Sequence, residues 1–398
     1  MTNLDYTQRT KCASCESTEL HTIHDFGIVP LAGYFPTEEE KTIRSDYPLK
    51  WQICKKCSLV QTDHLIDPQT LFKDYRYISS VGMQRHFNQY SEWLVNNGVN
   101  KDIEILEFGC NDGPLLLALK EKGINATGID PATNITKLGR DKGLNIIDDF
   151  FNTENVEKYS LTNKFDYILS SNSFAHISDI QSVVKGVTHA LKPNGKFIVE
   201  VQYLIDLVDK FQFDFIYHEH LYYYTLTSLQ NLLSPYGLSI IDFERIPIHS
   251  GSIRVIIGRS EEHEISNSVY LQIENEKEYL NLDTFSTKVE EALNNLSNFF
   301  KENKNKTIIG YGASGRANMI VNQLKLTTDD LKYIVDESPE RYNRYMANQE
   351  IPIISLEDLN EKGDYILLLA WNFSDMIIEK TKHLGIPYVI PFPNLKIV

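Results

Sequence analysis

Two stretches of this chain have the form of a buried strand that ends in a glycine-rich turn and continues into a helix. The first is Ile103–Gly113, followed by a helical pattern from Pro114 to Lys122. The second is Lys306–Arg316, which contains a literal G-x-G-x-x-G. Such a turn lies at the carboxyl end of a parallel strand, where glycines let a ligand approach the backbone closely. The chain is therefore expected to fold into two doubly wound α/β units, each with a ligand site at one sheet edge.

Strand and helix patterns alternate around the first turn, as a parallel sheet requires. Strands are expected at 126–130, 145–147, 165–170 and 196–200, after a helix from Met83 to Asn97. The strand at 126–130 ends in Asp130, about 20 residues after the turn, where an acid can hold ribose hydroxyls. Because the turn lacks the dinucleotide spacing, the pattern favours an adenosyl ligand without a pyrophosphate.

The second turn fits the dinucleotide pattern better, because Asp336 follows it by about 20 residues at the end of a short strand. Taken alone, Gly310–Gly315 therefore predicts a dinucleotide. A nicotinamide-dependent nucleotide-sugar oxidoreductase or epimerase is accordingly kept as an alternative function. Between the two units, 267–303 is charged and helical, which predicts a bridge between domains.

Four of the five cysteines form two C-x-x-C pairs, Cys12 with Cys15 and Cys54 with Cys57. This spacing lets two thiolates of each pair share one tetrahedral zinc ion. A redox-active pair would be single and set in a βαβ unit, so zinc is the better interpretation. Four thiolates leave no open position on the metal, which predicts a structural zinc in a small N-terminal module.

Composition limits the remaining classes of function. A chain of 398 residues is long enough for two or three domains. Its net charge of −15 argues against general binding to nucleic acid or anionic membranes. Its apolar runs are too short to span a bilayer and its start lacks a signal-peptide pattern, so a cytoplasmic location is expected.

The segment Phe213–Tyr224 concentrates histidine, carboxylate and phenol groups. Imidazole titrates near neutrality, and phenols can donate to a developing oxyanion, so the segment could move a proton. Packing at a core edge is the simpler interpretation of the segment by itself. His176 follows another strand end, and Arg254 is a candidate contact for an anionic ligand.

Together these features resemble the S-adenosylmethionine-dependent C-methyltransferases that act on nucleotide-linked ketosugars. The resemblance covers essentially the whole chain and is carried by the cysteine pairs, 75–80, 107–113, 172–176, 213–220, 310–318 and 370–373. It implies a zinc-binding domain at 1–72, a methyltransferase domain at 73–288 and a Rossmann-like domain at 289–398 that helps hold the nucleotide sugar.

The resemblance also implies roles for individual residues. His220 would remove the proton from C-3 beside a 4-keto group, and Glu219 would orient or support it. Tyr217 would lie close to the reacting ketosugar, with His176, Tyr75 and Tyr77 as secondary groups. His218 is the local competitor for the role of base. The cofactor would contact Glu107, Gly109, Asn111, Asp112, Gly113, Asp130 and Asn172. The sugar nucleotide, with dTDP expected and GDP or CDP open, would contact Gly310, Gly312, Gly315, Arg316 and Arg254.

Overall fold

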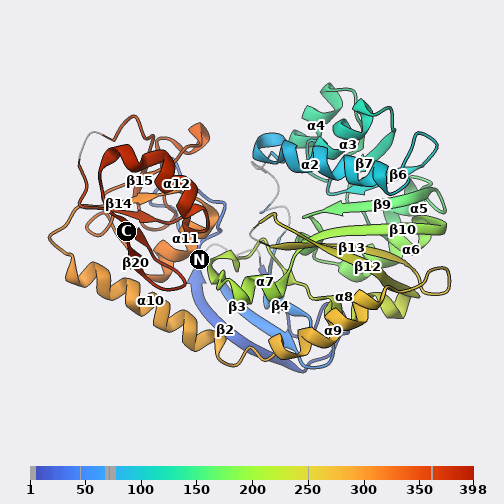
Figure 1. The fold of residues 1–398 in the computed structure, drawn as a ribbon, viewed down its shortest axis with the longest axis horizontal. Helices are drawn as coiled ribbons and strands as arrows, with labels where there is room; N and C mark the ends of the chain where they lie inside the picture. Colours follow the sequence, from blue (N-terminus) through green and yellow to red (C-terminus); the bar gives the residue numbers. More distant parts are fainter. Residues whose placement is uncertain (1–5, 45, 68–70, 72–77, 250, 360–361) are drawn as a thin grey trace.

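The computed structural model describes residues 6–44, 46–67, 71, 78–249, 251–359 and 362–398. Two bodies of sheet and helix lie on either side of the molecule, and the long N-terminal strands run beneath and between them (Figure 1). No helix in the described ranges has both the length and the apolar character that crossing a bilayer requires. The α/β class expected from the sequence is confirmed.

The first body is a seven-stranded sheet in the order β12-β13-β10-β9-β6-β7-β8. Strands β8, β7, β6, β9 and β10 are parallel, whereas β13 is antiparallel to both of its neighbours. The strands are β6 (Ile105–Phe108), β7 (Ala126–Ile129), β8 (Asn145–Ile147), β9 (Phe165–Ser171), β10 (Leu191–Gln202), β12 (Leu238–Ile246) and β13 (Ser252–Arg259). All four residues of β6 are buried, as expected for a parallel strand covered on both faces.

Helices connect and flank these strands. They are α2 (Ser80–Asn96), α3 (Pro114–Glu121), α4 (Thr133–Asp141), α5 (Thr153–Lys158), α6 (Ile180–Ala190), α7 (Leu204–Asp209), α8 (Leu226–Leu233) and α9 (Asn267–Tyr279). The charged helical stretch expected at 267–303 is two helices, because α9 ends at Tyr279 and α10 (Phe285–Glu302) begins after five intervening residues. In Figure 1, α9 lies along the first body and α10 along the second, so the predicted bridge is present.

The second body is another seven-stranded sheet, in the order β16-β17-β15-β14-β18-β19-β20. Its strands are β14 (Ile308–Tyr311), β15 (Ile334–Val335), β16 (Arg344–Tyr345), β17 (Pro352–Ile354), β18 (Tyr365–Leu368), β19 (Tyr388–Ile390) and β20 (Lys396–Ile397). The five inner strands are parallel and the two edge strands are antiparallel. Helices α11 (Gly315–Gln323) and α12 (Ser374–Thr381) follow β14 and β18.

The N-terminal part contributes a four-stranded antiparallel sheet in the order β11-β4-β3-β2 and a two-stranded pair of β1 and β5. The strands are β1 (Tyr6–Gln8), β2 (Leu20–Val29), β3 (Tyr47–Cys54), β4 (Val60–Thr62), β5 (His64–Ile66) and β11 (Tyr222–Tyr223). Strand β11 comes from the histidine-rich segment, and it pairs Tyr222 with Gln61 and Tyr223 with Val60. The N-terminal sheet therefore includes a strand that the chain supplies some 160 residues later.

One apolar cluster joins all three parts of the chain. It contains Trp51 of β3, Phe213 of the histidine-rich segment, and Ala317 and Trp371 of the second body. Burial of apolar surface is the main favourable term in folding. The shared core therefore fixes the two bodies and the N-terminal sheet relative to one another.

Candidate functional site

A cavity with a volume of about 440 Å³ opens at the carboxyl edge of the first sheet. Its wall includes residues from the turn after β6, from the ends of β7, β9 and β10, from the histidine-rich segment and from the start of α11. The lining residues include Gly109, Asn111, Asp130, Phe150, Asn172, His176, Gln202, Phe215, Tyr217, His220, Tyr222, His249, Ser314, Gly315 and Arg316. A single cavity thus collects groups from both bodies.

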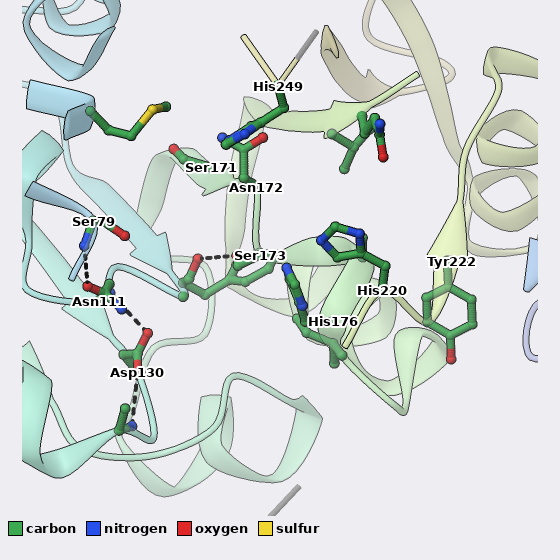
Figure 2. Close-up of a pocket in the computed structure, with 18 of the residues that line it drawn as sticks. Ser79, Asn111, Asp130, Ser171, Asn172, Ser173, His176, His220, Tyr222 and His249 are labelled. Carbon is green, nitrogen blue, oxygen red and sulfur yellow. Dashed lines mark hydrogen bonds between the residues drawn. The ribbon is translucent and has the colours of Figure 1, made fainter. Parts of the chain in front are cut away.

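The turn after β6 is built for close approach to a ligand. Gly109 has φ +67°, and a Cβ there would come within 2.3 Å of the Ser173 side chain. Asn111 also has a positive φ, 54°, and accepts a hydrogen bond from the Ser79 amide at 2.9 Å through its Oδ1. Figure 2 shows Ser79, Asn111 and Asp130 in line on one side of the cavity. Only glycine fits position 109 without displacing a neighbour.

Asp130 follows β7 and lies beside that turn. Its Oδ2 accepts from the Asn111 amide at 3.0 Å, and its Oδ1 accepts from the Ala132 amide at 2.9 Å. Each oxygen keeps a further lone pair, because a carboxylate oxygen can accept two hydrogen bonds. Burial raises the pKa of this carboxyl group, while the two amides oppose that shift. The carboxylate is therefore held in place at the cavity wall by two main-chain amides.

Three residues expected at the cofactor do not line the cavity. Gly113 packs under the turn, where a Cβ would come within 2.6 Å of Leu144. The Asp112 carboxylate accepts from the Ser80 amide at 3.1 Å and pairs with Lys142 at 3.2 Å, so it holds the start of α2. Glu107 lies one layer behind the wall.

Glu107 is 2% exposed and accepts from the Ser171 hydroxyl at 3.0 Å. Its Oε2 has no hydrogen-bond partner among the residues described. Burial raises the pKa of this carboxyl group to about 8. Glu107 is thus a buried acid behind the turn that follows β6, with one oxygen unpaired among the described residues.

The histidine-rich segment is neither a regular helix nor a long strand. Phe213–Phe215 forms a 3-10 turn, the chain then runs irregularly to His220, and β11 follows. Two hydrogen bonds attach the segment to the 3-10 turn Phe174–His176: the Leu221 amide donates to the Ala175 carbonyl at 2.9 Å, and His176 Nδ1 contacts the Glu219 carbonyl at 2.6 Å. The end of β9 and this segment are therefore locked side by side.

His176 and His220 face one another in the cavity. Their ring centroids are 4.9 Å apart at 64°, and Figure 2 shows the two imidazoles adjacent. His220 Nδ1 lies 3.1 Å from the Phe215 carbonyl oxygen. A carbonyl can only accept, so Nδ1 of each ring carries the hydrogen and Nε2 of each keeps its lone pair when the imidazole is neutral.

Burial keeps these imidazoles neutral. Burial lowers the pKa of His220 well below its ordinary value, and the neighbouring His176 lowers it further. Burial likewise lowers the pKa of His176, against an opposing effect of the Glu219 and Asn172 carbonyls. A neutral imidazole with a free Nε2 can accept a proton, which is the property of a general base.

His249 is a third imidazole in the wall, and no local sequence pattern pointed to it. It lies in the turn between β12 and β13 with φ 48°, and Figure 2 shows it beside Asn172. Burial lowers its pKa to about 4. A positive φ at a bulky residue is uncommon, but such strain is visible only in a structure.

Two neighbours of His220 lie away from the cavity. The Glu219 carboxylate accepts from the Gly33 amide at 3.2 Å, and burial raises its pKa. The Glu219 carboxylate therefore does not hold His220 in place. The Phe215 carbonyl binds His220 Nδ1, and Glu219 contacts His176 through its main-chain carbonyl. His218 is fully buried against Tyr47, with Nε2 3.2 Å from the Pro48 carbonyl. Tyr217 lies over His220 with ring centroids 4.2 Å apart.

The second glycine turn meets the cavity only at its end. Ser314, Gly315 and Arg316 line the wall, whereas Gly310 packs against Ile334 and Gly312 against Ala370. Gly310 and Gly312, both expected at the substrate, are thus packing positions.

Arg316 is 8% exposed and binds Asp214 through Nε at 3.0 Å and Nη2 at 2.8 Å. Its guanidinium also lies over the rings of Phe215 and Trp371. The fixed planar group presents its remaining edge to the cavity wall, a geometry suited to phosphate.

The acid expected to follow a dinucleotide turn has other partners here. Asp336 accepts from the Ala313 amide at 2.7 Å and from the Ser338 amide at 2.8 Å, and it pairs with Arg341 at 3.2 Å. Its carboxylate is therefore occupied by its own loop and a cation. The alternative of a nicotinamide enzyme gains no support from this geometry.

Arg254 was expected to contact an anionic ligand, and this prediction is wrong. The side chain is buried on β13, where it binds Glu200 at 2.5 Å and also pairs with Glu244. Its guanidinium lies over the rings of Tyr90 and Trp93. Two carboxylates already neutralise this cation, so it does not serve the cavity. Tyr75 and Tyr77 lie outside the described residues.

The four paired cysteines come together at one point. The sulfur atoms of Cys12 and Cys57 are 3.4 Å apart, those of Cys15 and Cys54 are 3.5 Å apart, and all four lie within 4.8 Å of one another. A tetrahedron with Zn–S bonds of about 2.3 Å has edges of roughly 3.8 Å. The residues therefore fit a closed four-thiolate zinc site, and none of the four cysteines lines the cavity.

Three family models match the chain in sequence order. A zinc-binding domain matches residues 12–72, a methyltransferase domain matches 76–242, and a domain described as the C-methyltransferase C-terminal domain matches 247–393. Together the matched ranges include the cysteines, the cavity turn and the start of α11.

Individual proteins agree with these models. The C-methyltransferase NovU of Streptomyces niveus is 29% identical over 98% of this chain and 96% of its own length. An uncharacterised methyltransferase of Staphylococcus carnosus is 27% identical over 39% of this chain and 79% of its own. The solved magnesium protoporphyrin IX methyltransferase of Synechocystis PCC 6803 is 15% identical over 45% of this chain and 81% of its own, with a TM-score of 0.36.

Proposed function

We propose that this chain, which matches a zinc-binding, a methyltransferase and a C-methyltransferase C-terminal domain in order, transfers a methyl group from S-adenosylmethionine to a nucleotide-linked 4-keto deoxysugar. The acceptor is the carbon beside the keto group, with C-3 as the expected position. One observation carries the proposal: a single cavity is lined by the cofactor turn, by two neutral imidazoles and by Arg316 from the second body.

The acceptor determines which reaction steps the cavity must catalyse. A sugar C–H is acidic enough for removal only beside a carbonyl, because the electron pair then moves onto oxygen as an enolate. His220 Nε2 takes this proton, and the Phe215 carbonyl at its Nδ1 keeps the ring in the required tautomer. S-adenosylmethionine, when bound, supplies an electrophilic methyl group that the enolate carbon accepts.

The second body is proposed to hold the nucleotide. The amide groups at the start of α11 and the free edge of Arg316 are suited to a diphosphate. Asn111 and Asp130 line the same cavity from the first body, after β6 and β7 respectively. The sugar would then lie between the two, beside His220, where a held geometry supplies much of the rate enhancement.

The test is a mass-spectrometric screen of dTDP-, GDP- and CDP-linked 4-keto deoxysugars with S-adenosylmethionine. The expected result is a product heavier by one methyl group, formed together with S-adenosylhomocysteine. Omission of the cofactor is the control. If none of the three carriers yields a methylated sugar, the proposal is rejected, and saturable binding of NAD(H) would then favour the oxidoreductase alternative.

A further inference from the structure

Gln202 is the last residue of β10, in the middle of the first sheet, and it lines the cavity. The cofactor turn and Asp130 lie at the ends of β6 and β7, on one side of β10 in the strand order. Strand β13 and the edge strand β12 lie on its other side. Gln202 is therefore placed toward the sugar and away from the adenosyl end of the cavity.

The direction of its side chain follows from strand geometry. Alternate residues of a strand point to the same face, so Gln202 shares the face of Glu200. The Glu200 carboxylate lies on the side of α2, where it contacts His86 at 2.7 Å. His249 lines the same cavity as Gln202.

The amide of Gln202 is an unused donor. Its Nε2 is buried and has no hydrogen-bond partner within the described ranges of the chain. Buried polar groups are normally paired, and leaving one unpaired costs folding free energy. A primary amide cannot take up or release a proton near neutrality, so its use in this cavity is to bind an oxygen.

The two reactive imidazoles cannot supply the same contact. His176 and His220 each direct Nδ1–H at a main-chain carbonyl, which leaves each Nε2 as an acceptor. They can receive a proton or a hydroxyl hydrogen, but a keto oxygen needs a donor. Tyr222, another wall residue, already donates its hydroxyl hydrogen to the Ser178 carbonyl at 2.8 Å.

We propose that Gln202 donates a hydrogen bond from Nε2 to the keto oxygen of the sugar and so stabilises the enolate formed by proton removal. The inference rests on the proposed function. As the C–H bond breaks, the proton goes to His220, and the electron pair forms a C=C bond and moves the carbonyl pair onto oxygen. Gln202 would then be a preorganised donor aimed at the atom that gains charge.

The test measures proton removal separately from methyl transfer. A dTDP-linked 4-keto-6-deoxy sugar is incubated in deuterium oxide with S-adenosylhomocysteine, and exchange at the carbon beside the keto group is followed by NMR. Gln202→Leu and Gln202→Glu should exchange roughly 10²-fold more slowly, the usual loss when one such donor is removed. Both should bind S-adenosylhomocysteine as the unaltered enzyme does.

Gln89→Leu is the matched control, because Gln89 lies exposed on α2. It should exchange at the normal rate. Gln202→Leu should unfold at the same or a higher temperature, since it replaces an unpaired buried amide with an apolar group of similar size.

Unchanged exchange in both Gln202 variants would overturn the inference. A third variant, His249→Phe, tests the alternative donor: loss of exchange in this variant alone would also overturn the inference and make His249 the donor. If the unaltered enzyme exchanges no proton with dTDP-, GDP- or CDP-linked ketosugars, the proposed function fails, and this inference fails with it.

Discussion

His218 and His220 are two positions apart and have different surroundings. His218 is enclosed between Tyr47 and the Pro48 carbonyl, whereas His220 faces His176 across the cavity. The neutral side chain of His220 has a free acceptor nitrogen at the cavity. These environments favour His220 as the proton acceptor.

His220→Asn should therefore lower methyl transfer by roughly 10²–10⁴-fold, the usual cost of removing a general base. Binding of S-adenosylhomocysteine, measured by calorimetry, should change little because the turn at Asn111 and Asp130 is untouched. The matched control is His218→Asn, which should retain most of its turnover. The reverse outcome, collapse in His218→Asn with normal turnover in His220→Asn, would assign the base to His218.

His218 also predicts a pH dependence of stability. Burial lowers its pKa from 6.5 to about 4 in the folded protein. Between these values the unfolded chain binds a proton at His218 that the folded protein does not, so stability falls as pH falls. This one group should reduce the free energy of unfolding by up to about 1.4 kcal/mol per pH unit across the window.

Urea unfolding of the native chain and of His218→Asn at pH 7, 6 and 5 measures the effect. As pH falls, the free energy of unfolding of the native chain should decrease relative to that of His218→Asn. Comparing the two proteins cancels the contributions of the other buried groups. Parallel pH profiles would contradict the assignment.

At the scale of elements, one carboxylate organises the helix that follows the histidine-rich segment. Glu276 of α9 is fully buried and accepts from the Tyr203 hydroxyl at 2.6 Å, from the Leu226 amide at 2.7 Å and from the Thr227 amide at 2.8 Å. The two amides belong to the first turn of α8, where main-chain amides have no acceptor within their own helix. An acid at a helix N-terminus also complements the helix dipole.

Glu276→Ala should lower the free energy of unfolding by about 3 kcal/mol, because hydrogen bonds to a charged group contribute roughly 1.5–3 kcal/mol and four donors, the Thr227 hydroxyl included, lose their acceptor. Chemical denaturation measures the change. Glu274→Ala on the same helix is the control, since Glu274 forms only an exposed pair with Lys277 and should change stability by less than about 0.5 kcal/mol. Equal effects of the two substitutions would refute the capping role.

At the scale of the molecule, the zinc module supports the cavity from behind. Cys12 and Cys57 share an apolar cluster with Val183 of α6 and Tyr222 of β11. The Asn231 side chain donates to the Cys57 carbonyl at 3.1 Å. Tyr222 itself lines the cavity, so the metal site stabilises the cavity wall through residues packed between them.

Removal of zinc with a chelator should therefore lower the unfolding temperature and abolish methyl transfer together, although the metal takes no part in the chemistry. Differential scanning fluorimetry and metal analysis follow the two changes, and added zinc should restore both. Cys110→Ser, which alters the cysteine outside the cluster, should keep one zinc per chain. A metal-free protein with normal stability and turnover would contradict this role.

A loop of the N-terminal part joins the two bodies at the cavity. The Gly33 amide binds the Glu219 carboxylate, and the Ala32 carbonyl accepts from Asn318 of α11 at 2.9 Å. Gly315 is packed so closely on Ala32 that a Cβ there would come within 3.1 Å. Through this loop, the histidine-rich segment and the start of α11 are held in one frame.

Local pattern was sufficient to predict the elements and the metal site. Strand, turn and helix around Gly109 and Gly312 are set by nearest neighbours, since glycine spacing and apolar runs act over a few residues. The spacing of the cysteine pairs predicted the thiolate cluster for the same reason. The resemblance of these motifs to a family added the cofactor, which the family models support.

Long-range contacts decided which polar groups are available. Arg254 and Arg316 cannot be told apart by local sequence. Glu200 and Glu244 neutralise Arg254, whereas Arg316 pairs with a single carboxylate among the described residues, that of Asp214, and lies at the cavity wall. His249 and Gln202 gave no local signal, because their exposure to the cavity depends on how β10, β13 and the turn before β13 pack. The sequence by itself determined the two glycine turns and the zinc ligands, because those depend on spacing along the chain. Only the tertiary structure decided which histidine faces His176, because that depends on the pairing of β11 with a strand formed 160 residues earlier.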